Sequence, residues 1–402
     1  MRLLILAAAL LVGLTAAEPA PADGFTVAVW RAPALRAAVM RSLAAERAIA
    51  GAGVLPDPMV GADVGRERPR EGEDMTMYGA MIEQPLPRWG ERDASRLGAR
   101  AQAAMARAEL AERAGALAAD VATALAEAEA AAASATLVAA SLQRMRSLGD
   151  SVRAQVASGG AMIGTALAVE TRVQQLEVQL AGFVQRQSDA TSEVRGLLGL
   201  ADDVPVPAAA WPDPAQVSER TLPMVQRAEA ERAEAEAMTR EATARGNPES
   251  SVGLAWERES AGTEMQTDKV SLIVRMSLPV WRSSYAASAD AARTRARAAM
   301  HDADASARMA RAAVARAARA VEQAGRAQAA ADATAARAGS ELDAVIRQVG
   351  SGGARFAEGI DLLERISEAH MQAIEARMNG RIAQAALWRL APPGPPPAES
   401  TP

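Results

Sequence analysis

The chain has 402 residues, a formal net charge of −5, no cysteine and only 3% aromatic residues. The charge argues against nucleic-acid binding, which needs a basic surface, and the lack of cysteine excludes disulfides and a lipid-bearing cysteine. Abundant alanine, arginine and glutamate are typical of long helices and coiled coils rather than of compact globular domains.

The N-terminus carries the pattern of a secretory signal peptide. Arg2 precedes an apolar run over residues 3–14, and small residues follow at 15–17. This run is shorter than the ~20 residues that a membrane-spanning helix needs, although an uncleaved anchor is the alternative. We therefore predict that residues 1–17 are a signal peptide and that the protein is exported. Because no later stretch looks apolar enough for a transmembrane helix, any passage through a membrane would need β-strands.

A block in the first half of the chain returns in the second half. Three pairs of residues share an offset of 192, namely Gly61 and Gly253, Pro87 and Pro279, and Trp89 and Trp281. Ser158-Gly159-Gly160-Ala161 recurs as Ser351-Gly352-Gly353-Ala354, with an offset of 193. We predict two structural repeats, residues 18–210 and 211–391, followed by a Pro-rich disordered tail over 392–402.

Each repeat contains a segment in which apolar and polar residues alternate, as they do in strands. In the second repeat Val270, Leu272 and Val274 share one face, whereas Ser271 and Arg275 share the other. The offset of 192 places Val60, Val64 and Ile82 on the apolar face of the first repeat, and Asp63 and Glu83 on the polar face. We predict β-hairpins over about 59–86 and 251–279.

Two long stretches without proline, 88–204 and 280–391, predict helices, because proline breaks helix interiors. Each stretch is interrupted once by a glycine pair, so we expect helical hairpins over about 88–199 and 281–390. The first ascending helix would measure about 90 Å at 1.5 Å per residue. Apolar stripes suited to coiled-coil packing mark the returning helices: Val169, Val173, Leu176, Leu180 and Phe183, then Leu363, Ile366, Ile374, Met378 and Ile382.

Four strands are too few to close a barrel. The smallest bacterial outer-membrane barrels have about eight strands, and a sheet edge left unpaired in lipid is not tolerated. If the strands enter a membrane, several copies of the chain must contribute to one barrel. A soluble, half-buried sheet is the alternative that the strands alone leave open.

The chain resembles the TolC-like outer-membrane efflux family from about residue 30 to 390. The resemblance rests on the segments that flank the strands, 55–61, 84–90 and 277–282, and on Leu197-Leu198-Gly199. It implies a homotrimer with a twelve-stranded β-barrel in the outer membrane and an α-helical tunnel in the periplasm. It also implies a periplasmic adaptor and an inner-membrane pump of the RND or ABC type as partners. Leu55-Pro56-Asp57-Pro58 is similar to members that serve heavy-metal exporters.

The resemblance also suggests functional residues. Adaptor docking falls on the two glycine tips, Ser158, Gly159, Gly160 and Ala161, and Ser351, Gly352, Gly353 and Ala354, for which simple turns are the alternative. A tunnel constriction falls on Arg355, Asp361 and Glu364, although pairing of these carboxylates with Arg365 at the surface is an alternative that the sequence favours slightly. Glu83 and Arg275 are placed on the lumen face of the barrel.

No catalytic arrangement stands out, so we predict that the protein is no enzyme and has no cofactor. The two histidines, His301 and His370, are far apart in sequence and fit a solvated surface and a packed position better than a metal site. Met77 and Met81 on the lumen face suit Cu(I), but wall filling by methionine is commoner. A periplasmic coiled-coil adaptor without channel activity is the rival function.

Overall fold

The structure is a computed structural model that describes residues 21–67, 75–158, 163–212, 217–218, 221–261, 265–350 and 356–395. The predicted signal peptide, residues 1–17, lies outside them. The elements are α1 Pro21–Arg31, α2 Pro33–Gly51, β1 Met59–Glu67, β2 Met75–Leu86, α3 Glu91–Ala157, α4 Ile163–Leu198, α5 Pro223–Ala244, β3 Ser250–Ala261, β4 Met265–Met276, α6 Arg282–Gly350 and α7 Phe356–Ala385, followed by a 3-10 turn, η3 Ala386–Arg389.

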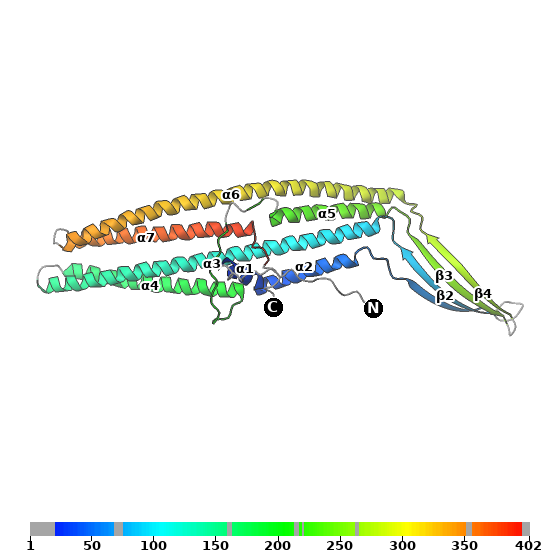
Figure 1. Cartoon of the computed structure of the whole chain (residues 1–402), viewed down its shortest axis with the longest axis horizontal. Coiled ribbons are helices and arrows are strands. Elements are labelled where there is room, and N and C mark those ends of the chain that lie inside the picture. The colour runs from blue at the N-terminus through cyan, green and yellow to red at the C-terminus, as the bar shows by residue number, and fades with distance from the viewer. Residues whose placement is uncertain are drawn as a thin grey trace, which may run out of the picture. The chain divides into compact units, whose positions relative to one another are not determined.

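The order helix, two strands, long helix and returning helix occurs twice along the chain (Figure 1). The first set is α2, β1, β2, α3 and α4, and the second is α5, β3, β4, α6 and α7. The predicted fold class, mainly helical with a small β part built from two repeats, is confirmed.

The chain divides into two compact units, and each contains parts of both repeats. The first consists of Met1–Ala34, Ala114–Gln216 and Ala317–Pro402, and the second of Leu35–Arg113 and Val217–Arg316. The first unit holds α4, α7 and the C-terminal parts of α3 and α6, and the second holds the sheet, α5, nearly all of α2 and the N-terminal parts of α3 and α6.

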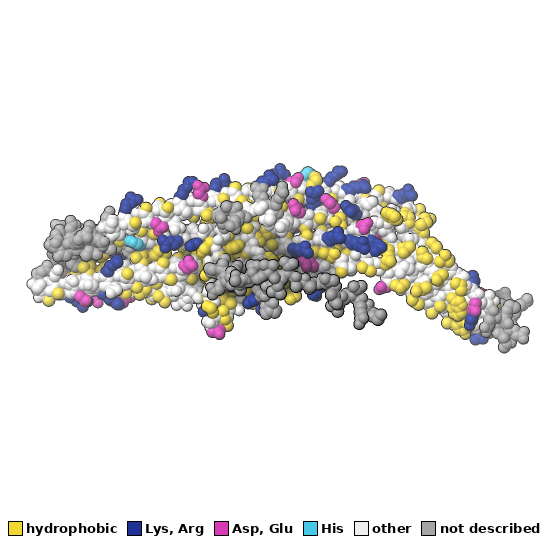
Figure 2. Space-filling model, viewed as in Figure 1, with side chains coloured by type: hydrophobic (Ala, Val, Ile, Leu, Met, Phe, Trp, Pro, Cys, Tyr) yellow, Lys and Arg dark blue, Asp and Glu magenta, His cyan; other side chains and the backbone are white. Residues whose placement is uncertain are grey.

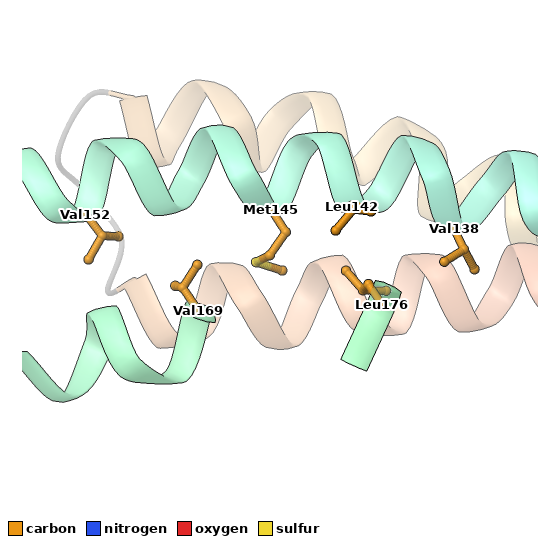
Figure 3. Packing of buried hydrophobic residues seen from close by; sticks show 6 residues of the cluster. All are labelled: Val138, Leu142, Met145, Val152, Val169 and Leu176. Carbon is orange, nitrogen blue, oxygen red and sulfur yellow. The ribbon is translucent and has the colours of Figure 1, made fainter. Parts of the chain in front are cut away.

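In the first unit, an apolar core joins α3 to α4 (Figure 3). Val138, Leu142, Met145 and Val152 of α3 pack with Val169 and Leu176 of α4, and all six are buried. Val173, Leu180 and Phe183 pack against this cluster, so the apolar stripe predicted for the first returning helix is confirmed. In α7, Ile366 is buried and the other stripe residues are half-buried.

A second cluster in the first unit gathers segments that are distant in sequence. The rings of Phe25 and Trp388 stack with their centroids 6.0 Å apart. Trp388 Nε1 donates to the Ala210 carbonyl, and Trp30 Nε1 donates to the Pro393 carbonyl, each over 3.1 Å. The cluster therefore ties α1, the segment between the repeats and the C-terminal segment together. Residues 392–395 of the predicted disordered tail are placed here, whereas 396–402 lie outside the described residues.

Gly115 of α3 makes room for this C-terminal segment. A Cβ at this position would overlap the carbonyl oxygen of Trp388 and lie 3.3 Å from Pro392 Cβ. We expect Gly115→Ala to destabilise the protein by about 1–3 kcal/mol, the usual effect of overpacking. Gly182→Ala is the matched control, because a Cβ there meets nothing within 4 Å, and we expect it to stabilise α4 by about 0.5–1 kcal/mol. Thermal unfolding followed by circular dichroism measures both, and equal effects would contradict this role of Gly115.

In the second unit, the four strands form one antiparallel sheet in the order β1-β2-β3-β4. β1 pairs with β2 and β3 with β4 within the repeats, while β2 pairs with β3 between them. Gly90, with φ 86°, adopts a left-handed conformation that lets the chain turn from β2 into α3. The Glu91 carboxylate then accepts from the Arg88 backbone N–H over 2.9 Å and stabilises this turn.

Ion pairs cover the exposed face of α5. Arg227 pairs with Glu231 over 3.0 Å, and Arg232 pairs with Glu236 over 3.1 Å. The hydrogen bond to Glu231 and the nearby charge of Glu112 raise the pKa of the Arg227 guanidinium above its ordinary value. Such exposed pairs keep the helix soluble and add only about 0–1 kcal/mol each.

The expectation that no later segment is apolar enough to cross a membrane needs a correction. Within the described residues, α3 contains an 18-residue window that passes the test of length and composition, with a mean hydropathy of 1.3. Half of that window is buried inside the structure. Packing against neighbouring helices therefore accounts for its apolar character.

Candidate functional site

The two faces of the sheet differ sharply in chemistry. One face carries large exposed apolar side chains: Val60, Val64, Tyr78, Ile82, Leu254, Trp256, Val270, Leu272, Val274 and Met276. Figure 2 shows apolar side chains gathered over the strands. Val60 and Val270 are 78% and 72% exposed, so none of the described residues covers this face. The faces predicted from alternation are those that the strands adopt.

The opposite face, which we call the inner face, carries an ion pair between the repeats. Arg275 of β4 donates to the carboxylate of Glu83 on β2, across the intervening strand β3. The hydroxyl of Ser251 on β3 donates to the same carboxylate. The Glu83 side chain is 8% exposed and that of Arg275 52%, so the carboxylate lies against the sheet and the guanidinium reaches outward. The structure thus brings together the two residues predicted for the lumen face.

A glycine on the neighbouring strand leaves room for the Glu83 side chain. Gly253 lies opposite Glu83 in the register, and a Cβ on it would lie 2.9 Å from the Ile82 carbonyl oxygen and 3.4 Å from Glu83 Cβ. The same device recurs on β1 and β2, because the carboxylate of Asp63 lies over Gly79. Large polar side chains on the inner face therefore fold over glycines of the neighbouring strand.

The methionines of the inner face fill space beside other glycines. Met81 lies beside Gly61, and Met77 lies beside Gly65. Met77 and Met81 are four residues apart in one strand, which corresponds to about 13 Å, too far for both sulfur atoms to bind one Cu(I) ion. The arrangement favours wall filling for this pair.

Polar and aromatic residues bound the apolar outer face at both ends. At one end Arg258 forms a bidentate pair with Asp268, at 2.7 and 2.8 Å, and lies 5.2 Å from the Trp256 ring. At the other end Trp89 and Trp281, which share the repeat offset, are 89% and 77% exposed. The stretch from Asp268 of β4 to Leu278, just beyond the strand, would cover about 25 Å along a membrane normal at a tilt of ~40°, the height of a typical apolar band.

The helical tip residues are described only in part. Ser158 directly follows α3, and its hydroxyl donates to the Gln155 carbonyl over 2.9 Å. The other docking candidates, Gly159, Gly160, Ala161, Ser351, Gly352, Gly353 and Ala354, lie outside the described residues, as does Arg355.

The two acidic residues suggested for the constriction differ in their surroundings. Asp361 is exposed on α7. Glu364 pairs with Arg172 of α4 over 2.9 Å and lines a 240 Å³ cavity between the two helical hairpins of the first unit. The partner is therefore not Arg365, the neighbour that the sequence offered, and the pair joins one repeat to the other.

Neither histidine belongs to a cluster of metal-ligand residues within the described ranges. His301 is exposed, and His370 Nδ1 donates to the Ile366 carbonyl over 2.8 Å, as expected for a packed and hydrogen-bonded residue. In the part of the chain that the structure describes, no three His, Cys, Asp or Glu residues cluster so as to hold a metal ion.

Comparisons with known proteins find the same fold in solved outer-membrane proteins. Similar structures include VceC of Vibrio cholerae, with a TM-score of 0.75, 15% identity and coverage of 92% of this chain and 95% of that chain. The open state of the MtrE outer membrane channel of Neisseria gonorrhoeae has a TM-score of 0.75 and 19% identity, and the match covers 94% of this chain and 90% of that chain. CusC has a TM-score of 0.76 and 14% identity, and the match covers 92% of this chain and 91% of that chain.

Residues 27–200, which hold most of the first repeat, match the family model described as outer membrane efflux protein. No curated protein matches the chain. The resemblance to the TolC-like outer-membrane efflux family is thereby confirmed. The heavy-metal branch stays a prediction, because a likeness to CusC at 14% identity concerns the fold.

Proposed function

We propose that the protein is the outer-membrane exit duct of an efflux or secretion system. Three copies would close their strands into a twelve-stranded barrel, and their helical hairpins would form a tunnel into the periplasm. The observation that carries this proposal is the sheet itself. Its outer face is apolar over the height of a membrane, its inner face is polar, and β1 and β4 are its edges among the described strands.

The partners follow from the same proposal. A periplasmic adaptor would dock on the helical tips around Ser158–Ala161 and Ser351–Ala354, and an inner-membrane pump of the RND or ABC type would supply the substrate. The rival function, an adaptor without channel activity, would leave the broad apolar face of the sheet in water. An exposed patch of this kind is costly in a soluble protein.

A second proposal concerns the constriction near the tips. The carboxylates of Asp361 and Glu364 from three copies would form a ring that favours cations, as charged rings do in other pores. Because Glu364 already pairs with Arg172, Asp361 should carry most of the effect. We expect Asp361→Ala to lower the cation preference of single channels severalfold, and Glu364→Ala to lower it less. A cation preference that survives the double variant would contradict the ring.

The proposed function is tested by recovering the protein from cells and reconstituting it. We expect it in the outer-membrane fraction, extractable only with detergent, and we expect discrete conductance steps in planar lipid bilayers. A heated sample should migrate differently from an unheated one in a denaturing gel, because barrels resist detergent until heated. A protein that stays in the aqueous fraction and gives no conductance would contradict the function.

A further inference from the structure

The two repeats share one strand register. In the first repeat Met59 pairs with Glu83 and Gly61 pairs with Met81. Adding 192 to each number gives Ser251 with Arg275 and Gly253 with Ile273, and both pairs occur between β3 and β4. The offset found in the sequence is therefore also an exact relation between hydrogen-bonded strands.

The seam between the repeats is the pairing of β2 with β3, and the offset of 192 predicts an equivalent pairing of β4 with β1. β2 of the first repeat pairs with β3 of the second, for example Glu83 with Gly253, Ile82 with Leu254 and Ala80 with Trp256. Exchanging the repeats turns β2 into β4 and β3 into β1. Within one chain, β4 and β1 are opposite edges of the sheet, about 14 Å apart, so this seam can form only with a second copy.

We propose that β4 of one copy pairs with β1 of the next in the register that the repeat dictates. Arg275 then lies opposite Gly61 of the neighbouring copy, Val274 opposite Ala62, and Leu272 opposite Val64. This inference rests on the proposed function, since it requires the copies to form one barrel. It goes further by fixing which residues meet at the seam.

The chemistry of the two edges fits this register. Toward lipid, it brings Leu272 and Val274 beside Val64 and Ala62, so that the apolar face continues from one copy to the next. On the inner face, Ser271 meets Gly65 and Arg275 meets Gly61. Each larger side chain lies opposite a glycine, as Glu83 lies opposite Gly253 within the chain.

The register also closes a ring of charges. Within a chain, Glu83 reaches past Gly253 to Arg275. At the seam Arg275 takes the place of Glu83, and Gly61 takes the place of Gly253. Glu83 of the neighbouring copy therefore lies two strands from Arg275, on the side opposite to the Glu83 of its own chain. Three copies give an alternating ring of three glutamates and three arginines.

Disulfide cross-linking tests the register directly, because the chain has no cysteine of its own. The variant carrying Ala62→Cys and Val274→Cys places its cysteines opposite each other at the seam, within the Cα distance that a disulfide requires. After oxidation of the detergent-extracted protein with copper phenanthroline, we expect covalent trimers as the main product. The inner-face variant Gly65→Cys with Ser271→Cys provides a second, independent pair with the same expected product.

Two matched control variants move the cysteine on β1 two residues away from Ala62, in either direction along the strand. Val60→Cys or Val64→Cys, each combined with Val274→Cys, should cross-link far less than Ala62→Cys with Val274→Cys. Stronger cross-linking of either control would overturn the register. Trimers in which none of these cysteine pairs forms a disulfide would overturn the seam but not the proposed channel. A protein that is monomeric in aqueous buffer would instead overturn the proposed function.

Discussion

Replacing Arg275 with glutamine should raise the cation preference of the proposed channel, and replacing Glu83 with glutamine should lower it. In either variant, three charges of one sign would remain on the inner face of the proposed barrel, where the native pairs cancel each other. Rings of like charge attract counter-ions into a pore, so we expect the permeability ratio of potassium to chloride to change severalfold in opposite directions. The reversal potential of single channels in a salt gradient measures both.

Two controls separate this effect from general damage to the barrel. The double variant Glu83→Gln with Arg275→Gln removes both charges and should return the ratio close to that of the native channel. Lys269→Gln removes one partner of the pair that Lys269 forms with Glu257 over 3.5 Å. Both of these side chains are exposed, so this variant should change the ratio less. Shifts of the same sign in both single variants would contradict the placement of this pair on the lumen wall.

Leu176→Ala should destabilise the helical part by about 2–5 kcal/mol, since a buried leucine loses its transfer free energy and leaves a cavity. Leu176 is 3% exposed and packs in the core between α3 and α4 (Figure 3). The loss should appear in thermal unfolding followed by the helical circular dichroism signal.

The matched control for that substitution is Leu167→Ala on the same helix. Leu167 is 67% exposed in the protomer and lies outside the α3–α4 core, so the same chemical change should have a much smaller effect. If both variants melted together with the native protein, the core between α3 and α4 would not hold the hairpin.

Local rules carry much of the fold. Prolines indicate where helices end, and the alternation of apolar and polar residues predicts the two faces of each strand. The apolar stripe from Val169 to Phe183 predicts the side of α4 that packs against α3. These features need only neighbouring residues, and for that reason they could be predicted. The offset of 192 added the equivalence of the repeats, and the observed registers obey it.

Contacts between distant segments could not be predicted in the same way. The pair of Glu83 and Arg275 was expected on one face, but its contact depends on the pairing of β2 with β3, which joins the repeats. Glu364 had Arg365 beside it in sequence, whereas its partner is Arg172 of the other hairpin. The cluster of Phe25, Trp30 and Trp388 carries no periodic signal, because its members come from opposite ends of the chain.

The number of chains in the detergent-extracted particle tests the central claim most directly, and native mass spectrometry can count them. Each chain supplies a single sheet of four described strands, so a closed cylinder needs its neighbours to contribute the rest. We predict three chains per particle. A single chain that remains folded in buffer without detergent would contradict the account.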